Sequence, residues 1–566
     1  MNKRHKMILA AAMLLSPLSA TWSADTNSTP SSSASDTQRP NILFIACDDM
    51  RPELGCYGKD YIHSPNIDAL ASNGIVFNHA YCQQAVCSPS RSSLLTGTRP
   101  DTDQVWDLVT HFRKALPNVT TLMQNFKNNG YFVQGMGKIF HGSLDDPASW
   151  SVPWQVPKAD IYALPEDAAR VGKNENVQGE PDAVAWNKKE NAGAEASSYA
   201  LPNTNPAVNS NPTEKPKGKK KGKSKGGKGA ADEGGKANSR GPIYECADVP
   251  DNTFTDGKVA DLAVKTLQDL AKKKEPFFLA VGFIKPHLPW VSPKKYWDLY
   301  DPAKIDLAPN QFLPVDAPSY AVLPNDGEVR AYKGVPPSGP IPPEIQHKLK
   351  QAYFAGVSYT DAQIGKVMEE LKTLGLDKNT IVILWGDHGW KLGEHSAWGK
   401  HSNVENDVNA PLILSVPGMK NPGEHSDALV EFVDIYPTLS ELAGLPLPSH
   451  LEGTSFKPLI DNPNLPWKTA AFSQYPRKGG KTGSGFDVMG YTMRTDRYRF
   501  TVWVDRNDHT KVDAVELYDH KTDPQENYSL AKKPEYAELV KSLMEQWQKG
   551  WQGNKPPASS ITPKSS

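Results

Sequence analysis

Four short runs of continuous apolar residues predict strands that are buried on both faces of a sheet. They cover residues 41–47, 276–283, 380–386 and 411–416. Stretches with apolar residues at helical spacing alternate with these runs, at residues 67–73, 119–129, 257–273 and 345–375. Strands that alternate with helices indicate an α/β fold, in which helices cover both faces of a mostly parallel sheet.

The pattern changes after residue 466, where apolar segments become shorter and alternate with polar positions. Residues 491–504 and 515–518 favour a small antiparallel sheet, and residues 536–551 favour a terminal helix. We therefore expect a large domain over residues 40–466 and a smaller C-terminal subdomain over residues 467–555. Residues 556–566 are expected to form a disordered tail.

Two further segments lack the apolar residues that a core needs. Residues 25–39 are rich in Ser and Thr, and residues 197–240 are rich in Pro, Gly, Asn and Lys, with eight lysines between Lys215 and Lys228. Such segments bury too little apolar surface to offset the entropy cost of ordering. They predict a disordered linker and a disordered surface insertion. The lysines could recruit a polyanionic polysaccharide or an anionic cell surface, or the insertion could be a solvated spacer.

The first residues have the layout of a secretory signal, with a basic start, an apolar stretch over residues 7–18 and small residues up to Ala24. We predict a signal peptide at residues 1–24 and an exported, periplasmic or extracellular protein; the alternative is an uncleaved amphipathic N-terminus. No later segment has the roughly 20 apolar residues of a membrane span, so we expect none.

Charge and cysteine content narrow the classes of partner and scaffold. Lys and Arg number 63 against 64 Asp and Glu, a formal net charge of -1. A chain with this balance has no overall positive potential that would attract nucleic acid or an anionic membrane. An anionic substrate would therefore have to be bound by positively charged side chains within its own site. Five cysteines in a chain of 566 residues do not form a disulfide framework, although one or two bridges stay possible.

Reactive residues follow three of the predicted strands. Asp48 and Asp49 come after the first strand, His287 follows the second by way of Lys285 and Pro286, and Asp387 and His388 follow the third. In open parallel sheets, ligands bind outside the carboxyl ends of the strands. The two acidic groups predict an oxygen-rich cation site, which suits calcium or magnesium better than zinc. The alternative is that the Asp-Asp pair only begins a turn.

Cys87 opens the segment Cys87-Ser88-Pro89-Ser90-Arg91. Pro89 suits the first turn of a helix and Gly97 suits its end. Cys87 would then lie at a helix N-terminus, where the helix dipole favours a developing anion, and it is a candidate for a cysteine of low pKa. The alternative for an isolated cysteine is a buried structural residue.

The pattern Cys87-x-Pro89-x-Arg91, with Leu94-x-Thr96-Gly97 after it, resembles the signature of the type I sulfatases. In that family a separate enzyme, the formylglycine-generating enzyme, oxidises the cysteine to formylglycine. The resemblance is greater to the iduronate-2-sulfatase branch and extends from residue 41 to about residue 527. It implies an alkaline-phosphatase-like α/β fold with a smaller C-terminal subdomain. The matching segments are residues 47–58, 83–91, 137–141, 276–287, 386–402 and 489–504.

The resemblance also implies a calcium site and a set of catalytic residues. Asp48, Asp49, Asp387 and His388 would hold one calcium ion together with the formylglycine derived from Cys87. Many sulfatases have Asn where this chain has His388, but the iduronate-2-sulfatase branch carries His there. The resemblance further implies that Lys138 and Lys400 clamp the sulfate oxygens and that His287 acts as general acid. It implies that Arg91 anchors the formylglycine and that His141 assists deprotonation of the second hydroxyl group of its hydrate.

Three neighbours of these residues, Arg51, Trp390 and His401, are candidates for the substrate pocket. Trp390 could stack on a sugar face, or it could pack in the core. The predicted function is hydrolysis of a sulfate ester on a sulfated carbohydrate, with a 2-O-sulfated uronic acid as the leading substrate. Two alternatives stay open: a phosphatase or phosphonate hydrolase of the same superfamily, and a non-catalytic exported protein that binds polysaccharide.

Overall fold

The computed structural model describes residues 39–169, 240–324, 328–478, 485 and 487–561. The predicted signal peptide, nearly all of the predicted linker, and the lysine-rich insertion up to residue 239 lie outside these residues. Residues 558–561, which were expected in a disordered tail, form the short helix α15 (Ala558–Ile561). Within the described ranges, no helix combines the length and the apolar composition of a membrane span.

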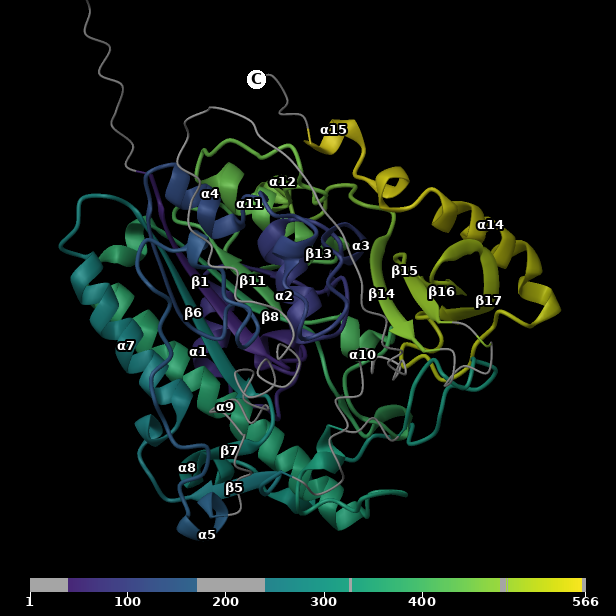
Figure 1. The fold of residues 1–566 in the computed structure, drawn as a ribbon, viewed down its shortest axis with the longest axis horizontal. Helices are drawn as coiled ribbons and strands as arrows, with labels where there is room; N and C mark the ends of the chain where they lie inside the picture. The colour runs from purple at the N-terminus through teal and green to yellow at the C-terminus, as the bar shows by residue number, and fades with distance from the viewer. Residues whose placement is uncertain (1–38, 170–239, 325–327, 479–484, 486, 562–566) are drawn as a thin grey trace, which may run out of the picture. The chain divides into compact units, whose positions relative to one another are not determined.

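A seven-stranded sheet with the order β12-β2-β11-β8-β1-β6-β4 forms the centre of the described chain (Figure 1). Strands β4, β6, β1 and β8 run parallel to one another, whereas β11 is antiparallel to both β8 and β2. All four predicted strands are present in this sheet. The strands are β1 (Asn41–Asp48), β2 (Ile75–Phe77), β4 (Phe132–Gly137), β6 (Phe277–Pro286), β8 (Thr380–Gly386), β11 (Leu412–Ser415) and β12 (Glu424–Ser426).

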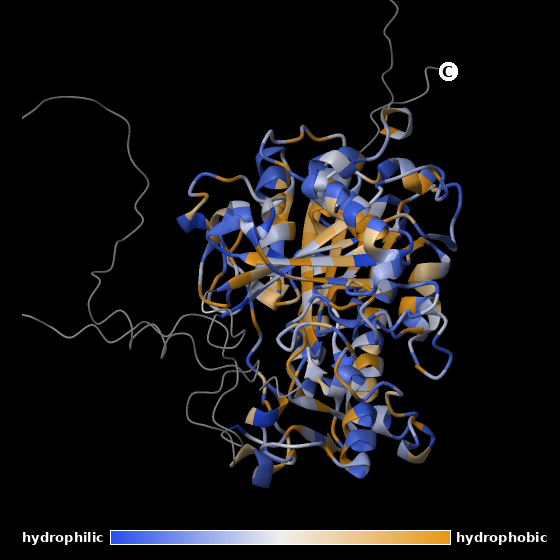
Figure 2. Cartoon of the chain, turned by 90° about the vertical axis from the view of Figure 1, so that its right-hand side faces the viewer, coloured by the Kyte–Doolittle hydropathy of each residue, from blue (hydrophilic) through white to orange (hydrophobic). Residues whose placement is uncertain are grey.

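Strand β1 shows why the apolar runs are continuous. Leu43 and Ile45 pack in one hydrophobic cluster, whereas Ile42 and Phe44 pack in a second cluster on the opposite face. Successive side chains of a strand point to opposite faces, so a strand that is covered on both sides needs apolar residues at every position. Figure 2 shows the resulting apolar strands at the centre, with polar residues outside them.

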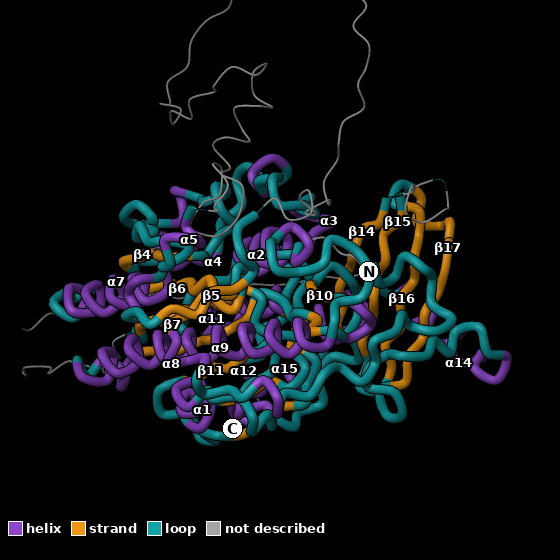
Figure 3. Tube along the Cα trace, turned by 90° about the horizontal axis from the view of Figure 1, so that it is seen from below, coloured by secondary structure: helices purple, strands orange, loops and turns teal. Residues whose placement is uncertain are grey.

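Helices on the two faces of the sheet complete these clusters. On one face lie α1 (Pro65–Ser72), α7 (Thr255–Leu270) and α9 (Pro343–Thr373). On the other lie α2 (Cys87–Thr96), α4 (Leu122–Asn128) and α11 (Ile435–Leu442). In Figure 3, α2 and α4 lie on the opposite side of β6 from α9. The helices predicted at residues 67–73, 119–129, 257–273 and 345–375 correspond to α1, α4, α7 and α9.

A four-stranded antiparallel sheet, β14-β15-β16-β17, follows in the C-terminal part. Residues 491–504 contain the end of β15 and most of β16, joined by a turn, and β14 was not predicted. Leu543 of helix α14 packs against Phe500 and Leu517 of this sheet, as expected for a terminal helix. The bounds are β14 (Ala471–Arg477), β15 (Val488–Arg494), β16 (Tyr498–Asp505), β17 (Asp508–Asp519) and α14 (Ala537–Gln548).

All five cysteines are free thiols, so the one or two disulfide bridges that stayed possible from the sequence are not formed. Short strands and helices connect the layers described above. The short strands are β3 (Ala80–Tyr81), β5 (Tyr244–Ala247), β7 (Trp290–Pro293), β9 (Lys391–Leu392), β10 (Trp398–Gly399) and β13 (Val430–Glu431). The short helices are α3 (Pro100–Asp103), α5 (Pro165–Ala168), α8 (Lys294–Trp297), α10 (Glu405–Val408) and α12 (Lys457–Asp461).

Candidate functional site

The residues predicted from the strand ends meet at one edge of the main sheet. Asp48 is the last residue of β1, Lys138 follows β4, His287 follows β6, and Asp387 follows β8. Because these strands are parallel, their carboxyl ends lie side by side, and the side chains that follow them converge. Of the ten predicted catalytic and metal-binding residues, nine lie within 4 Å of another of the ten, at the distances given below.

Four buried side chains form a candidate cation site at this edge. One ligand atom from each of Asp48, Asp49, Cys87 and His388 lies within 4.8 Å of the others. Asp48 Oδ1 and Asp49 Oδ2 accept no hydrogen bond from the described residues. Buried carboxylate oxygens in this state favour a cation, and carboxylate with imidazole suits a hard divalent ion. The residues present therefore fit a divalent cation.

Asp387, the remaining predicted ligand, lies beside this group. Its Oδ1 accepts a hydrogen bond from Asp49 N at 3.1 Å and lies 3.5 Å from His388 Nε2. Asp49 has a φ of 58°, in the left-handed region that costs energy for a residue with a side chain. The hydrogen bonds at Asp387 and from Tyr353 Oη to Asp49 O, at 2.7 Å, hold this turn in place.

Cys87 is the first residue of α2, and Gly97, with a φ of 70°, caps the end of this helix after Thr96, as the sequence predicted. Its Sγ lies 3.3 Å from His388 Nε2 and accepts a hydrogen bond from Lys400 Nζ at 3.4 Å. Burial and the neighbouring Asp48 carboxylate raise the pKa of the thiol well above its usual value, and the nearby lysines only partly oppose this shift. The expectation of a low-pKa cysteine is therefore wrong for the thiol.

Arg91 connects helix α2 to two strand ends. Its Nε donates to Asp387 Oδ2 at 2.8 Å, and its Nη2 lies 3.5 Å from Asp48 Oδ1. Its Nη1 donates to the carbonyl oxygens of Lys138 and Ile139. The guanidinium is fully buried and uses its planar fork to fix three segments at once.

Two lysines place positive charge near Cys87. Lys138 Nζ lies 2.6 Å from Asp48 Oδ2, and Lys400 Nζ lies 2.9 Å from Asp49 Oδ1. Lys138 can turn into the site because Gly137 has a φ of 68°, and a Cβ there would lie 1.9 Å from Gly282 O. Both ammonium groups lower the free energy of an anion at Cys87.

His287 has a defined hydrogen-bond arrangement. Its Nδ1 lies 2.6 Å from the carbonyl oxygen of Leu288, so Nδ1 carries a proton and donates it. Its Nε2 lies 3.8 Å from Asp49 Oδ2 and 3.2 Å from Glu328 Oε1. Burial opposes the charged imidazolium, but the carboxylates of Asp49 and Asp48 outweigh burial and raise its pKa.

Sequence reasoning missed two residues of this group. Glu328 lies against both His287 and Lys400, and Lys285 Nζ donates to the carbonyl oxygens of His287, at 2.8 Å, and Pro289, at 2.5 Å. Lys285 was visible as part of the strand-end sequence, but its contact was not. Glu328 follows no predicted strand and belongs to no motif, so no signal in the sequence pointed to it.

Comparison with known proteins identifies the family. The family model described as Sulfatase matches residues 40–445, which is more than half of the chain. The chain belongs to the sulfatase family. A second model, described as N-sulphoglucosamine sulphohydrolase, C-terminal, matches residues 393–552. The sulfatase family resemblance seen in the sequence is thus confirmed, and the protein is an enzyme that hydrolyses sulfate esters.

Similar proteins include two curated iduronate 2-sulfatases. The Mus musculus protein is 34% identical, and the match covers 90% of this sulfatase and 94% of the relative. The Homo sapiens protein is 33% identical with the same coverages, 90% and 94%. A protein named Sulfatase from Formosa agariphila is 28% identical over 90% of this chain and 86% of its own.

Solved structures confirm the alkaline-phosphatase-like fold. A structure described in complex with its substrate D-glucosamine-2-N,6-O-disulfate has a TM-score of 0.63 at 22% identity, covering 92% of this chain and 99% of the other. A phosphonate monoester hydrolase of Agrobacterium radiobacter has a TM-score of 0.65 at 20% identity, covering 90% and 95%. At these identities the likeness concerns the fold alone.

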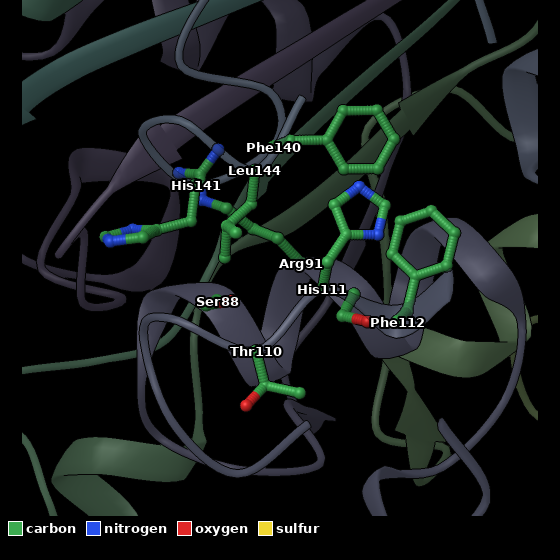
Figure 4. A pocket seen from close by; sticks show the side chains of 9 residues that line it. Ser88, Arg91, Thr110, His111, Phe112, Phe140, His141 and Leu144 are labelled. Atoms are coloured by element: carbon green, nitrogen blue, oxygen red, sulfur yellow. The ribbon is translucent and has the colours of Figure 1, made fainter. Parts of the chain in front are cut away.

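His141 lies beside the start of helix α2 in this sulfatase. It lines a cavity of about 10 Å³ together with Ser88, Arg91, His111 and Leu144 (Figure 4). This volume is close to that of a single water molecule. The structure therefore places His141 next to the residues that follow Cys87, on the loop that carries Lys138.

The three candidates for the substrate pocket have different surroundings. Arg51 is partly buried, and its charge is neutralised by Glu53 and Glu394, each at 2.9 Å. Trp390 is fully buried with its ring centroid 6.3 Å from that of Trp290 and 5.3 Å from Lys400 Nζ, so it packs in the core. His401 has a φ of 81° and lies with its ring 6.1 Å from Tyr475.

Proposed function

We propose that this sulfatase hydrolyses the sulfate ester of a sulfated sugar through a formylglycine derived from Cys87 and one calcium ion. The position of Cys87 carries this proposal, since its Sγ, at the start of α2, lies 3.3 Å from His388 Nε2 and 3.4 Å from Lys400 Nζ. The raised pKa of the thiol makes a thiolate nucleophile unfavourable. Once formed, the hydrate of formylglycine supplies two hydroxyl groups, one to attack sulfur and one to expel sulfate.

The acidic residues at the strand ends would hold the calcium ion. Asp48, Asp49, Asp387 and His388 are the proposed protein ligands, and carboxylate oxygens favour calcium over softer metals. When bound, the ion supplies a positive charge that favours the ionised form of a hydroxyl group beside it. Arg91 keeps Asp387 in place and would also anchor the modified residue.

Two lysines and two histidines would bind the sulfate and move protons. Lys138 and Lys400 would contact the sulfate oxygens. Because both lysines are buried, their charges would stabilise the transition state more than the same charges would at a site exposed to water. His287 would give its Nε2 proton to the departing sugar oxygen, since Nδ1 is committed to the Leu288 carbonyl. His141 would take a proton when sulfate is released.

The proposed substrate is a 2-O-sulfated uronic acid in an oligosaccharide or polysaccharide. Identities of 34% and 33% to two iduronate 2-sulfatases over 90% of the chain support this choice. Arg51 and His401 are proposed to line the sugar pocket, and Trp390 to support it from the core. We further propose that residues 1–24 are a signal peptide that directs export, and that a formylglycine-generating enzyme matures the protein. The proposed domains are a catalytic domain over residues 40–466 and a C-terminal subdomain over residues 467–555.

The experiment expresses the sulfatase with a formylglycine-generating enzyme and measures the mass of the Cys87 peptide and the release of sulfate. We expect conversion of Cys87 to the aldehyde, and hydrolysis of a 2-O-sulfated uronic acid disaccharide that C87A abolishes. The matched control is C246A, at an exposed cysteine, which should behave as wild type. Unmodified Cys87 in fully active protein would contradict the mechanism, and faster hydrolysis of phosphate esters than of sulfate esters would contradict the substrate class.

A further inference from the structure

Glu328 is a buried carboxylate at the centre of the site with no role in the proposed mechanism. It precedes the short 3-10 helix Val329–Ala331, and 4% of its surface is exposed. Its Oε1 lies 3.2 Å from His287 Nε2, and its Oε2 lies 3.5 Å from Lys400 Nζ. Oε2 accepts no hydrogen bond from any residue in the described part of the chain. Oε2 is thus paired by charge with Lys400, yet it keeps room for a hydrogen bond that the described residues do not donate, and buried acceptors are seldom left in this state.

A second metal ion is one conceivable partner, because Asp49, His287 and Glu328 place ligand atoms within 4.8 Å of one another. Lys400 argues against it. Its ammonium group lies 2.9 Å from Asp49 Oδ1 and 3.5 Å from Glu328 Oε2, so a positive charge already bridges the two carboxylates. A further cation beside this ammonium group would be repelled at short range.

The sulfate group of the substrate is also excluded as the partner of Glu328. Burial alone would favour the neutral acid, but Lys400 and His287 outweigh it and hold the pKa of Glu328 well below its usual range. The ionised carboxylate can only accept hydrogen bonds, and it repels a sulfate anion. The donors that the substrate itself brings to this acceptor are the hydroxyl groups on the alcohol part of the ester.

The contact with His287 locates that donor. His287 Nε2 faces the oxygen that leaves with the sugar in the proposed reaction, and Glu328 Oε1 lies 3.2 Å from the same nitrogen. The nearest donors on a sugar are the hydroxyl groups on the carbons next to the sulfated carbon. We propose that Glu328 binds substrate by accepting a hydrogen bond from such a neighbouring hydroxyl group, so that the site selects sulfated sugars with a free hydroxyl beside the ester. The inference rests on the proposed function, because it assigns His287 to the leaving oxygen.

The test compares two enzymes on three substrates. Wild type and E328Q are assayed for kcat/KM on a 2-O-sulfated uronic acid disaccharide, on its 3-deoxy analogue, and on 4-nitrophenyl sulfate. Removing the hydroxyl group should lower kcat/KM of wild type by about 10- to 100-fold, as expected for a hydrogen bond to a charged group. E328Q should lose a similar factor on the disaccharide, with little further loss on the 3-deoxy analogue.

The deciding quantity is the coupling between E328Q in the enzyme and the removal of the hydroxyl group from the substrate. Two groups that contact each other give non-additive free-energy changes in such a double-mutant cycle. If the losses of E328Q and of the deoxy substrate multiply, or if wild type cleaves both sugars equally well, the inference is wrong. A residue that only orients His287 and Lys400 would lower kcat/KM by one common factor on all three substrates. That outcome also overturns the inference.

Controls separate folding and the proposed function from this result. E369Q changes an exposed glutamate on helix α9 and should match wild type on every substrate. Thermal unfolding shows whether E328Q folds, and E328D, which keeps the charge on a shorter side chain, replaces it if it does not. The wild-type comparison of the two sugars decides the inference even without a variant. If wild type releases sulfate from none of the three esters, the proposed function fails rather than the role of Glu328.

Discussion

Arg91 Nε donates a hydrogen bond to Asp387 Oδ2 at 2.8 Å, and this contact joins helix α2 to the end of strand β8. Both side chains are fully buried. Arg91 lies one helical turn after Cys87, and Asp387 directly precedes His388, which contacts the Cys87 sulfur. The ion pair therefore fixes the proposed nucleophile relative to the proposed cation ligands.

Replacing Arg91 should destabilise the fold and abolish activity. R91A leaves Asp387 and Asp48 buried without their guanidinium partner, and breaking a buried pair costs about 3–5 kcal/mol. Denaturant unfolding and sulfate release measure the two effects, and the formylglycine content of each variant is determined alongside. The control R497A removes an arginine that is 48% exposed and pairs with Asp519, and should leave the free energy of unfolding close to that of wild type. Wild-type stability in R91A would contradict the role assigned to this pair.

Removal of the divalent ion should lower both activity and thermal stability. An ion that binds only the folded state stabilises it by about 2.7 kcal/mol at a concentration 100-fold above its Kd. We expect chelation to inactivate the wild type, calcium to restore it, and the double variant D48N/D49N to show no calcium-dependent shift in melting temperature. D377N, at an exposed position, should keep the wild-type shift. A calcium response that survives in D48N/D49N would place the ion elsewhere.

Asp103 should make the stability of the protein depend on pH. It is fully buried and accepts hydrogen bonds from Ser92 Oγ at 2.7 Å and Val105 N at 2.9 Å. Burial raises its pKa from 3.8 to about 8 in the folded state. At a pH between these two pKa values, the carboxyl group of Asp103 is ionised in the unfolded chain and protonated in the folded chain. The stability that the buried neutral acid contributes is therefore fully present below the unfolded pKa, and it is lost as pH rises through the folded pKa.

The variant D103N removes this titration. Its free energy of unfolding, relative to wild type, should therefore increase between pH 5 and pH 8 by on the order of a few kcal/mol. Urea unfolding at several pH values with saturating calcium measures the difference. Parallel pH profiles for the two proteins would show that Asp103 ionises with an ordinary pKa.

Arg477 should couple the C-terminal sheet to the active site. This buried residue at the end of β14 donates to the carbonyl oxygens of Tyr320 at 2.7 Å, Ala321 at 3.1 Å and His401 at 2.6 Å. His401 directly follows the proposed sulfate ligand Lys400, so loss of the guanidinium fork should release this loop. R477A, and also R477K, which lacks the planar fork, should lower kcat/KM by about tenfold or more, consistent with the loss of one or more buried hydrogen bonds. R506A, an arginine at the β16–β17 turn, serves as the control, and equal activities of R477A and R506A would refute the coupling.

The central strands and the reactive residues at their ends could be predicted because their signals are local. A strand covered on both faces must be apolar at every position, and an Asp-Asp pair or a Cys-x-Pro-x-Arg segment is contiguous in the chain. The antiparallel sheet was less well predicted, since β14 carries polar residues, among them Gln474 and Arg477, whose partners lie in other segments.

The sequence by itself determined the sheet, the family and the residues at the strand ends, because each depends on neighbours along the chain. Only the tertiary structure decided which of these residues contact each other and how deeply they are buried. Burial raises the pKa of the Cys87 thiol, where the helix N-terminus alone had favoured a lower one. Glu328 reaches His287 because two loops distant in sequence fold together, and that approach is a property of packing across the whole sheet.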